Sequence, residues 1–268
     1  MIKNAKVNLV LIPARAGSVG IRRKNLMKVN EKSLVYRAMN HALAIKSNRM
    51  LICISSDSQE LLSASRTKSN SNDLTITSNS LDSEFSFNGK VVFHLRPSFL
   101  SDSSSSTWSL VYYLSEKLFS LFGIEVLNTL ILQPTSPFRS FKELEYFRSI
   151  LNNNLSEGTG IVSVKALGDV SPARMYTINS KGFLQPSVNS NPLEEFSPRQ
   201  ELVQHYARDG GYYCFANKAL EISGPISSSY QPYVRTFPWN INIDCIDDLV
   251  VAQSLPRDIY CEDPNEYQ

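Results

Sequence analysis

The chain has 268 residues, a hydrophobic fraction of 42% and a formal net charge of +2 at pH 7. This length suits one sizeable α/β domain with an insertion, and the small charge gives no reason to expect a nucleic-acid partner. No apolar stretch approaches membrane-spanning length, the polar first residues lack a signal-peptide core, and the four cysteines include no Cys-x-x-Cys pair. We therefore expect a reduced, cytoplasmic protein that binds neither nucleic acid nor a membrane.

Short apolar runs and helical patterns alternate along the chain. Five runs have the length and composition of buried strands: residues 7–12, 50–54, 91–95, 129–132 and 160–164. A helical stripe follows the first run, with Ser33 as its expected N-cap, and a second helix is expected over 107–121. This alternation predicts an α/β fold with a doubly wound, mostly parallel, Rossmann-like sheet. Ligands of such sheets bind at the carboxyl ends of strands, so the loops after the first, third and fourth runs are the candidate site.

Two segments interrupt the alternation. Residues 67–90 are rich in Ser and Asn and poor in apolar residues, which predicts a surface excursion. Residues 170–208 carry scattered prolines and little periodicity, and such long loops are usually functional or part of an interface. This second segment contains apolar residues that need burial, namely Leu184, Val188, Leu193 and Phe196. We therefore expect one domain, 1–268, in which the inserted segment 170–208 joins two copies as a homodimer.

The loop after the first predicted strand combines glycines with cations. It reads Pro13-Ala-Arg-Ala-Gly-Ser-Val-Gly-Ile-Arg-Arg-Lys-Asn25. Glycines let backbone N–H groups approach phosphate oxygens, and Arg15 and Lys24 add the positive charge that a leaving pyrophosphate requires. The Walker A pattern is absent. A Gly-rich turn with solvated basic residues is the alternative, and spacing alone leaves both interpretations open.

Two later stretches place polar groups in defined patterns. In Leu132-Gln-Pro-Thr-Ser-Pro-Phe-Arg139 the prolines fix a turn that presents Gln133 and Thr135, although an ordinary turn before a helix N-cap at Ser140 stays open. In Asn240-Ile-Asn-Ile-Asp244 strand alternation would put Asn242 and Asp244 on one face, as oxygen ligands of a metal. Asp247 is expected to cap the last helix.

Together these motifs resemble the acylneuraminate cytidylyltransferase family, the CMP-sialic acid synthetases. The resemblance covers nearly the whole chain, in order, through five stretches: 12–25, Arg96-Pro97 with Ser101-Asp102, 132–139, 209–213 and 241–244. It implies transfer of CMP from CTP to the anomeric hydroxyl of a nonulosonic (sialic-acid-like) sugar, with release of pyrophosphate. It also implies Mg²⁺ as cofactor and a homodimer as the assembly.

The resemblance implies roles for individual residues. The catalytic set is Arg15, Lys24 and Asp244, of which the two cations hold the triphosphate. The nucleotide-binding set is Ala14, Arg15, Gly17, Ser18, Lys24, Asn25, Arg96 and Ser106, with Asn25 on the ribose and the last two selecting cytosine. The substrate-binding set is Gln133, Thr135, Arg199, Gln200, Tyr206 and Asp209, with Arg199 and Gln200 supplied by the dimer partner. Asp244 would hold Mg²⁺, with Asn242 as a weaker ligand.

Departures from the family pattern keep alternatives open. Val19 stands where the family usually has Lys, and Asn242 replaces the first Asp of the usual Asp-x-Asp pair. A diamino nonulosonate is therefore at least as well predicted as N-acetylneuraminate. One alternative is a cytidylyltransferase for the eight-carbon acid of lipopolysaccharide cores, against which the 170–208 insertion and the 132–139 motif argue. A weakly active homologue that binds CMP-sugar is another.

The three histidines are weighed separately. His41 and His94 are expected to be structural, because nothing in the sequence pairs them for catalysis. For His205, next to the expected sugar or dimer region, substrate binding and a structural role stay equally open.

Overall fold

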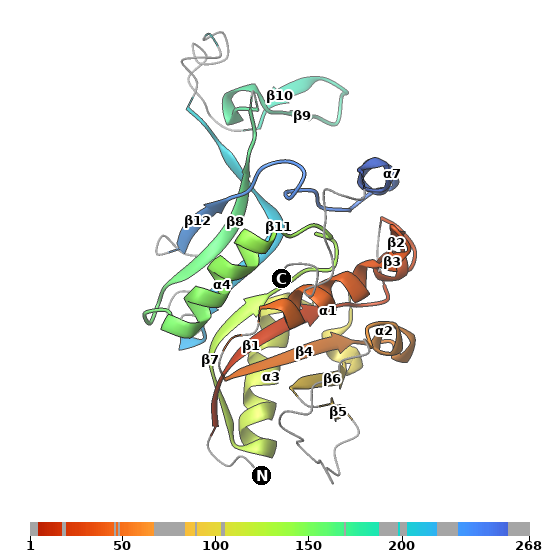
Figure 1. Cartoon of the computed structure of the whole chain (residues 1–268). Coiled ribbons are helices and arrows are strands. Elements are labelled where there is room, and N and C mark those ends of the chain that lie inside the picture. Colours follow the sequence, from red (N-terminus) through yellow and green to blue (C-terminus); the bar gives the residue numbers. More distant parts are fainter. Residues whose placement is uncertain are drawn as a thin grey trace.

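An eight-stranded sheet forms the centre of the computed structural model (Figure 1). The structure describes residues 5–17, 20–45, 47, 49–66, 84–88, 90–102, 105–168, 170–187, 198, 203–218 and 230–256. In order across the sheet, the strands are β12 (Tyr230–Val234), β8 (Gly160–Ala166), β11 (Tyr206–Ala216), β7 (Ile124–Ile131), β1 (Ala5–Pro13), β4 (Met50–Ser56), β6 (Val91–Leu95) and β5 (Phe85–Asn88). β11 and β5 run antiparallel to their neighbours, and the other strands share one direction. The expected doubly wound, mostly parallel fold is confirmed.

Helices cover both faces of the sheet (Figure 1). α1 (Leu34–Ala44) and α4 (Phe141–Asn153) pack with Val10 and Ile12 of β1, whereas α3 (Thr107–Phe122) packs on the other face with Leu9 and Leu11. Successive side chains of a strand point to opposite faces, so the unbroken apolar run of β1 serves two cores. The shorter elements are α2 (Gln59–Ala64), α7 (Ile246–Ser254), the 3-10 turns η1 (Lys24–Leu26), η2 (Ser98–Leu100) and η3 (Pro172–Arg174), and the hairpins β2–β3 (Lys28–Val29, Lys32–Ser33) and β9–β10 (Tyr176–Ile178, Leu184–Pro186).

Two expectations about the C-terminal third are wrong. Residues 241–244 form no strand, and Ile243 N–H instead donates to the carbonyl of Thr135 at 2.8 Å, in the loop after β7. Asp247 does not cap α7. The Asp248 carboxylate does so, because it accepts from the N–H groups of residues 244 and 245 at 2.9 Å each, and these hydrogen bonds hold its pKa below the usual value.

The two segments that interrupt the alternation are described in part. Of 67–90, residues 84–88 return the chain to the sheet as the edge strand β5. Of 170–208, the described parts include the β9–β10 hairpin, which projects beyond the body of the sheet (Figure 1) and leaves Ile178 and Leu184 exposed. Val188, Leu193 and Phe196 lie outside the described residues. Among the helices that the structure describes, none combines the length and apolarity needed to cross a membrane.

Ser140 begins α4 with a reciprocal pair of hydrogen bonds. Its Oγ accepts from Glu143 N–H at 3.2 Å, and Glu143 Oε2 accepts from Ser140 N–H at 2.8 Å. Because this capping box satisfies two backbone donors, Ser140→Ala is expected to lower the free energy of unfolding by about 1 kcal/mol. Urea denaturation measures the loss, with Ser149→Ala on the exposed side of α4 as control. Equal losses in both variants would contradict the capping role.

Candidate functional site

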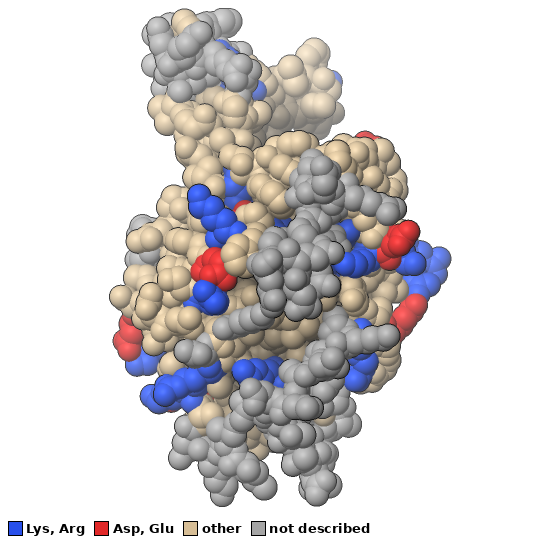
Figure 2. Space-filling view, viewed as in Figure 1, with Lys and Arg blue, Asp and Glu red and all other residues tan. Residues whose placement is uncertain are grey.

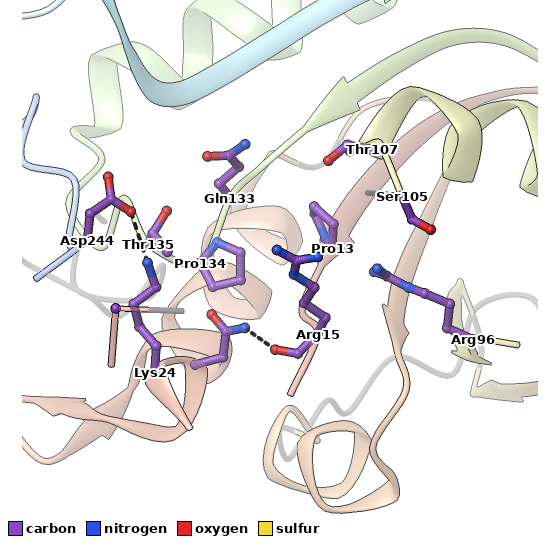
Figure 3. A pocket seen from close by; sticks show the side chains of 12 residues that line it. Pro13, Arg15, Lys24, Arg96, Ser105, Thr107, Gln133, Pro134, Thr135 and Asp244 are labelled. Carbon is purple, nitrogen blue, oxygen red and sulfur yellow. Dashed lines mark hydrogen bonds and ion pairs between the residues drawn. The ribbon is translucent and has the colours of Figure 1, made fainter. Parts of the chain in front are cut away.

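A polar cavity of about 440 Å³ opens at the carboxyl ends of β1, β6 and β7 (Figure 3). Its walls come from the loops after these three strands, which are the loops that topology alone marked as the candidate site. The C-terminal segment before α7 adds Asp244. The lining residues are Pro13, Arg15, Gly20, Lys24, Asn25, Arg96, Ser105, Thr107, Gln133, Pro134, Thr135 and Asp244.

Positive charge dominates this cavity. Arg15, Lys24 and Arg96 all line it, against the single carboxylate of Asp244. Figure 3 shows Arg15 between the other two cations. On the face drawn in Figure 2, by contrast, Lys and Arg side chains lie in small separate groups, some beside Asp or Glu. The arrangement in the cavity therefore suits an anionic ligand.

The first loop is fixed by hydrogen bonds within itself and to the loops that follow β4 and β6. Asn25 Nδ2 donates to the carbonyl of Arg15 at 2.9 Å, and Ala16 N–H donates to Asp57 Oδ1 at 2.7 Å. The Arg15 guanidinium reaches across to the carbonyl of Asp102 at 2.9 Å. The Oδ1 atom of Asn25 is buried and has no hydrogen-bond partner within the described residues, so an acceptor remains for a ligand.

Lys24 and Asp244 join the first loop to the C-terminal segment. Their side chains form an ion pair at 2.9 Å, in which the lysine is largely buried and the carboxylate is exposed. Gly20 packs directly against this segment, because an added Cβ would collide with the backbone carbonyl of Asp244. The site is therefore assembled from both ends of the described chain.

Arg96 lies on the opposite wall, with most of its surface buried. Its guanidinium donates to Ser55 Oγ at 3.2 Å, to the Ser55 carbonyl at 3.0 Å and to the Leu100 carbonyl at 3.4 Å. Burial lowers the pKa of Arg96, which the nearby Asp57 carboxylate partly offsets. A guanidinium carries five N–H donors, so two remain for a ligand in the cavity.

Gln133 and Thr135 present their side chains from a loop that Arg139 holds from behind. The buried Arg139 guanidinium donates to the carbonyls of Gln133, Ser136 and Gly211 at 3.0, 2.7 and 3.0 Å. Burial lowers the pKa of Arg139 to about 10, so it stays charged at neutral pH. In the sequence this arginine is visible only as the last residue of the 132–139 motif. Its supporting role could not be predicted, because it includes a hydrogen bond to Gly211, which lies 72 positions away.

Several residues expected in the site are described by the structure but do not line the cavity. Ala14 is buried, Gly17 is not among the lining residues, and Ser106 caps α3 while its neighbours Ser105 and Thr107 line the cavity. Tyr206 is exposed at the start of β11, outside the cavity wall. Ser18, Arg199 and Gln200 lie outside the described residues.

Asp209 requires a correction, because it is not available to a sugar. Its carboxylate is fully buried and pairs with Arg235 at 3.0 Å. It also accepts from the Ser163 hydroxyl and from Gly211 N–H. A buried carboxylate with these partners is part of the fold's support, so we remove Asp209 from the expected substrate-binding residues.

Asn242 lies beside Asp244 despite the absence of a strand. Its amide nitrogen donates to Asp244 Oδ2 at 2.5 Å, while its amide oxygen lies 3.5 Å from Ser136 Oγ. In this arrangement Asn242 orients the carboxylate rather than offering an oxygen next to it. Within the described ranges, no group of three or more His, Cys, Asp or Glu side chains is arranged to hold a metal.

The histidines lie outside the cavity lining. His41 is buried beside Arg139, and burial together with that arginine holds the pKa of His41 well below its usual value. His94 is fully buried behind Arg96. The backbone carbonyl of His205 accepts from Leu167 N–H at 3.0 Å, where β11 begins.

Comparison with known proteins adds two findings. Residues 9–84 match the family model of cytidylyltransferases. Among solved structures, the chain resembles a CMP:2-keto-3-deoxy-manno-octonic acid synthetase complexed with CTP, with a TM-score of 0.54 and 14% identity, covering 94% of this chain and 100% of that one. It also resembles 4-diphosphocytidyl-2C-methyl-D-erythritol synthase from Anaerococcus prevotii DSM 20548, with a TM-score of 0.53 and 11% identity, covering 92% of this chain and 97% of that one. The fold is that of the nucleotidyltransferases. Together with the family match, it supports a place in the cytidylyltransferase superfamily.

The close approach of Gly20 to Asp244 gives a direct test of how the site is assembled. Gly20→Ala is expected to lower the free energy of unfolding by about 1–3 kcal/mol, because the new methyl group must displace the C-terminal segment. Gly17→Ala is the matched control in the same loop, where an added Cβ meets no atom within 4 Å. Thermal unfolding measures both changes. A stability of Gly20→Ala equal to that of Gly17→Ala would contradict the contact.

Proposed function

We propose that this protein transfers CMP from CTP to the anomeric hydroxyl of a nonulosonic, sialic-acid-like sugar and releases pyrophosphate. The observation that carries the proposal is the convergence of Arg15, Lys24 and Arg96 on one polar cavity at the carboxyl ends of the strands. A nucleoside triphosphate carries the several negative charges that such a cavity suits. The cytidylyltransferase match over residues 9–84 includes two of these cations.

Arg15 and Lys24 are proposed to act on the phosphates. In this reaction the anomeric hydroxyl gives up its proton to solvent and its oxygen bonds to the α-phosphorus of CTP, while the bond from that phosphorus to pyrophosphate breaks. Negative charge then accumulates on the leaving pyrophosphate. The two cations stabilise this charge more strongly in the transition state than in the bound substrate, which accelerates the transfer.

The nucleoside is proposed to lie between Asn25 and Arg96. The unpartnered Oδ1 of Asn25 fits a ribose hydroxyl as donor. The two remaining N–H groups of Arg96 fit O2 and N3 of cytosine, which are both acceptors. Uracil carries a hydrogen on N3, so it would set a donor against a donor, and a site of this kind discriminates strongly.

The sugar acid is proposed to bind against Gln133 and Thr135, the remaining polar wall of the cavity. We keep Arg199 and Gln200 as contacts that a second subunit would supply. An eight-carbon 2-keto-3-deoxy sugar acid is the second candidate substrate, because a synthetase for such an acid is among the proteins that share this fold.

Mg²⁺ is the expected cofactor, and the residues present fit an ion that arrives largely on the nucleotide. Asp244 is exposed at the cavity and is the single carboxylate among the lining residues, whereas Mg²⁺ commonly combines one or two carboxylates with substrate phosphates and water. The ion would offset negative charge on the phosphates that the sugar hydroxyl approaches. Asn242 and Lys24 hold the Asp244 carboxylate in place through one oxygen each.

A pyrophosphate-release assay with four nucleotides and a panel of sugar acids tests the function. We expect turnover with CTP and a nonulosonic acid, strong preference over UTP, ATP and GTP, and little with the eight-carbon acid. Arg15→Ala and Lys24→Ala should each remove about 2–4 kcal/mol of transition-state stabilisation while the fold stays intact. Equal turnover with UTP would refute the cytidine assignment, and CTP binding without turnover on any acid would favour a CMP-sugar-binding homologue.

Asp244→Ala is expected to abolish turnover in a folded protein. Asp247→Ala, which removes an exposed carboxylate outside the cavity lining, is the control. Asn242→Asp should keep activity within about tenfold and tighten metal binding, because a cation bound between two neighbouring carboxylates offsets the repulsion between their negative charges. Magnesium titrations of the rate measure these effects. Normal magnesium-dependent activity in Asp244→Ala would show that the metal is held elsewhere.

The homodimer is proposed to form through the projecting β9–β10 hairpin. Phe183 is exposed on it, beside the similarly exposed Ile178 and Leu184, and a second copy of the chain would bury these apolar side chains. Light scattering at micromolar concentration should report a dimer for wild type and a monomer for Phe183→Glu. Phe119→Glu, at an equally exposed phenylalanine on α3, should remain dimeric. A monomeric wild type would remove Arg199 and Gln200 from the proposed site.

A further inference from the structure

Arg96 is held by a buried polar chain that leads away from the cavity. Both its Nε and a terminal nitrogen donate to Ser55, at 3.2 Å to the hydroxyl and 3.0 Å to the carbonyl. Ser55 Oγ in turn lies 2.9 Å from His94 Nδ1. Ser55 and His94 are directly paired residues of β4 and β6, and both are fully buried. Strand pairing therefore brings together the two side chains behind Arg96.

The direction of these hydrogen bonds follows from counting protons. The Arg96 guanidinium has only donors, so Ser55 Oγ must accept from it. The Ser55 hydroxyl hydrogen then finds its acceptor in His94 Nδ1, which requires a neutral imidazole with its proton on Nε2. The reverse arrangement, in which Nδ1 donates, would leave the Ser55 hydroxyl hydrogen buried without an acceptor and is unfavourable.

The His94 ring is itself fixed by the end of the 67–90 segment. Phe85 of β5 stacks on the ring at a centroid distance of 4.8 Å, and Glu84 Oε2 lies 3.7 Å from Nε2. The same carboxylate oxygen accepts from the Tyr113 hydroxyl at 2.6 Å. A ring flip would turn Nε2 away from this carboxylate and Nδ1 away from Ser55. The chain from Glu84 to Arg96 thus has one favoured arrangement.

We propose that Ser55 and His94 are positioning residues that orient Arg96 for the nucleotide, and so set affinity and base selection. This inference rests on the proposed function of the cavity. Ser55 holds the Nε edge of the guanidinium and the Leu100 carbonyl accepts from the other terminal nitrogen, so the orientation of the two remaining donors is fixed. Without that acceptor, binding must itself fix the orientation, which weakens affinity. Neither residue lines the cavity, so the rate at saturating CTP should change little.

Calorimetric titration with CTP and steady-state kinetics with CTP and UTP test the proposal on the full chain. Ser55→Ala and His94→Phe are expected to raise Kd and KM for CTP by about tenfold and to reduce discrimination against UTP, with kcat within about twofold. His94→Phe keeps a ring against Phe85 but lacks the acceptor. His94→Asn offers an amide oxygen near the position of Nδ1 and should stay within about threefold of wild type. Ser65→Ala, which removes another fully buried hydroxyl, is the control.

Arg96→Ala separates failure of this inference from failure of the proposed function. If Arg96→Ala binds CTP as wild type does, the assignment of this wall to cytosine is wrong. If it loses affinity while folded Ser55→Ala and His94→Phe keep theirs within about twofold, only the positioning role is wrong. Ser55→Ala should add no further loss to Arg96→Ala, and additive losses would overturn the proposal. Should Ser55→Ala not fold, the two His94 variants decide, and equal CTP affinities in them would overturn it.

Discussion

A buried arginine, Arg235, connects the elements on which one wall of the cavity is built. Its side chain donates to Glu143 at 2.8 Å and to Asp209 at 3.0 Å, and it also reaches the carbonyl of Phe138. Buried charges are stable only when such partners replace the lost water, and removal of one partner is strongly destabilising. Because Arg235 follows β12 while its partners lie on α4, β11 and the loop after β7, the ion pairs fix how these elements meet.

The cavity depends on that arrangement because a second buried arginine, Arg139, supports the loop that forms one of its walls. Arg139 is close to Arg235 and donates to the carbonyls of Gln133 and Ser136, so the wall that carries Gln133 and Thr135 is supported by a buried charge. On the opposite wall, Arg96 is supported by Ser55 and His94. Both walls are thus oriented by directional hydrogen bonds from buried groups. Apolar packing alone, which has no direction, would leave such polar side chains free to reorient.

The parts of this architecture that sequence could predict are those with a local signal. β1, β4 and β6 are rich in apolar residues because both faces of a parallel strand are buried. β11 carries an apolar run only in its second half, 212–216, because Arg208, Asp209 and two glycines occupy its first half. The pairing that makes the buried Asp209 tolerable is with an arginine 26 residues later, and periodicity cannot detect it. β12 carries Pro232 and lies at the sheet edge, where proline is tolerated but a strand signal is weak.

The same division applies to the site. The glycine- and cation-rich first loop and the turn after β7 were visible as motifs, and both line the cavity. The segment at 241–244 alternates as a strand would, yet its backbone donates a hydrogen bond to the loop after β7. The expected proximity of Asn242 and Asp244 is therefore present although the expected strand is not. The support given by Arg139, Ser55 and His94 depends on distances between chain segments and has no local pattern.

The ion pair between Lys24 and Asp244 joins residues that are 220 positions apart. Contacts of such separation are expensive in loop-closure entropy and slow to form, so they come late when a chain folds. During synthesis, the cation-rich loop leaves the ribosome long before Asp244 exists. The strands that precede the loops of Arg15 and Arg96, β1 and β6, can therefore pair with β4 while the cavity still lacks the one carboxylate among its described lining residues. A complete cavity therefore requires the C-terminal segment as well as the amino-terminal half of the chain.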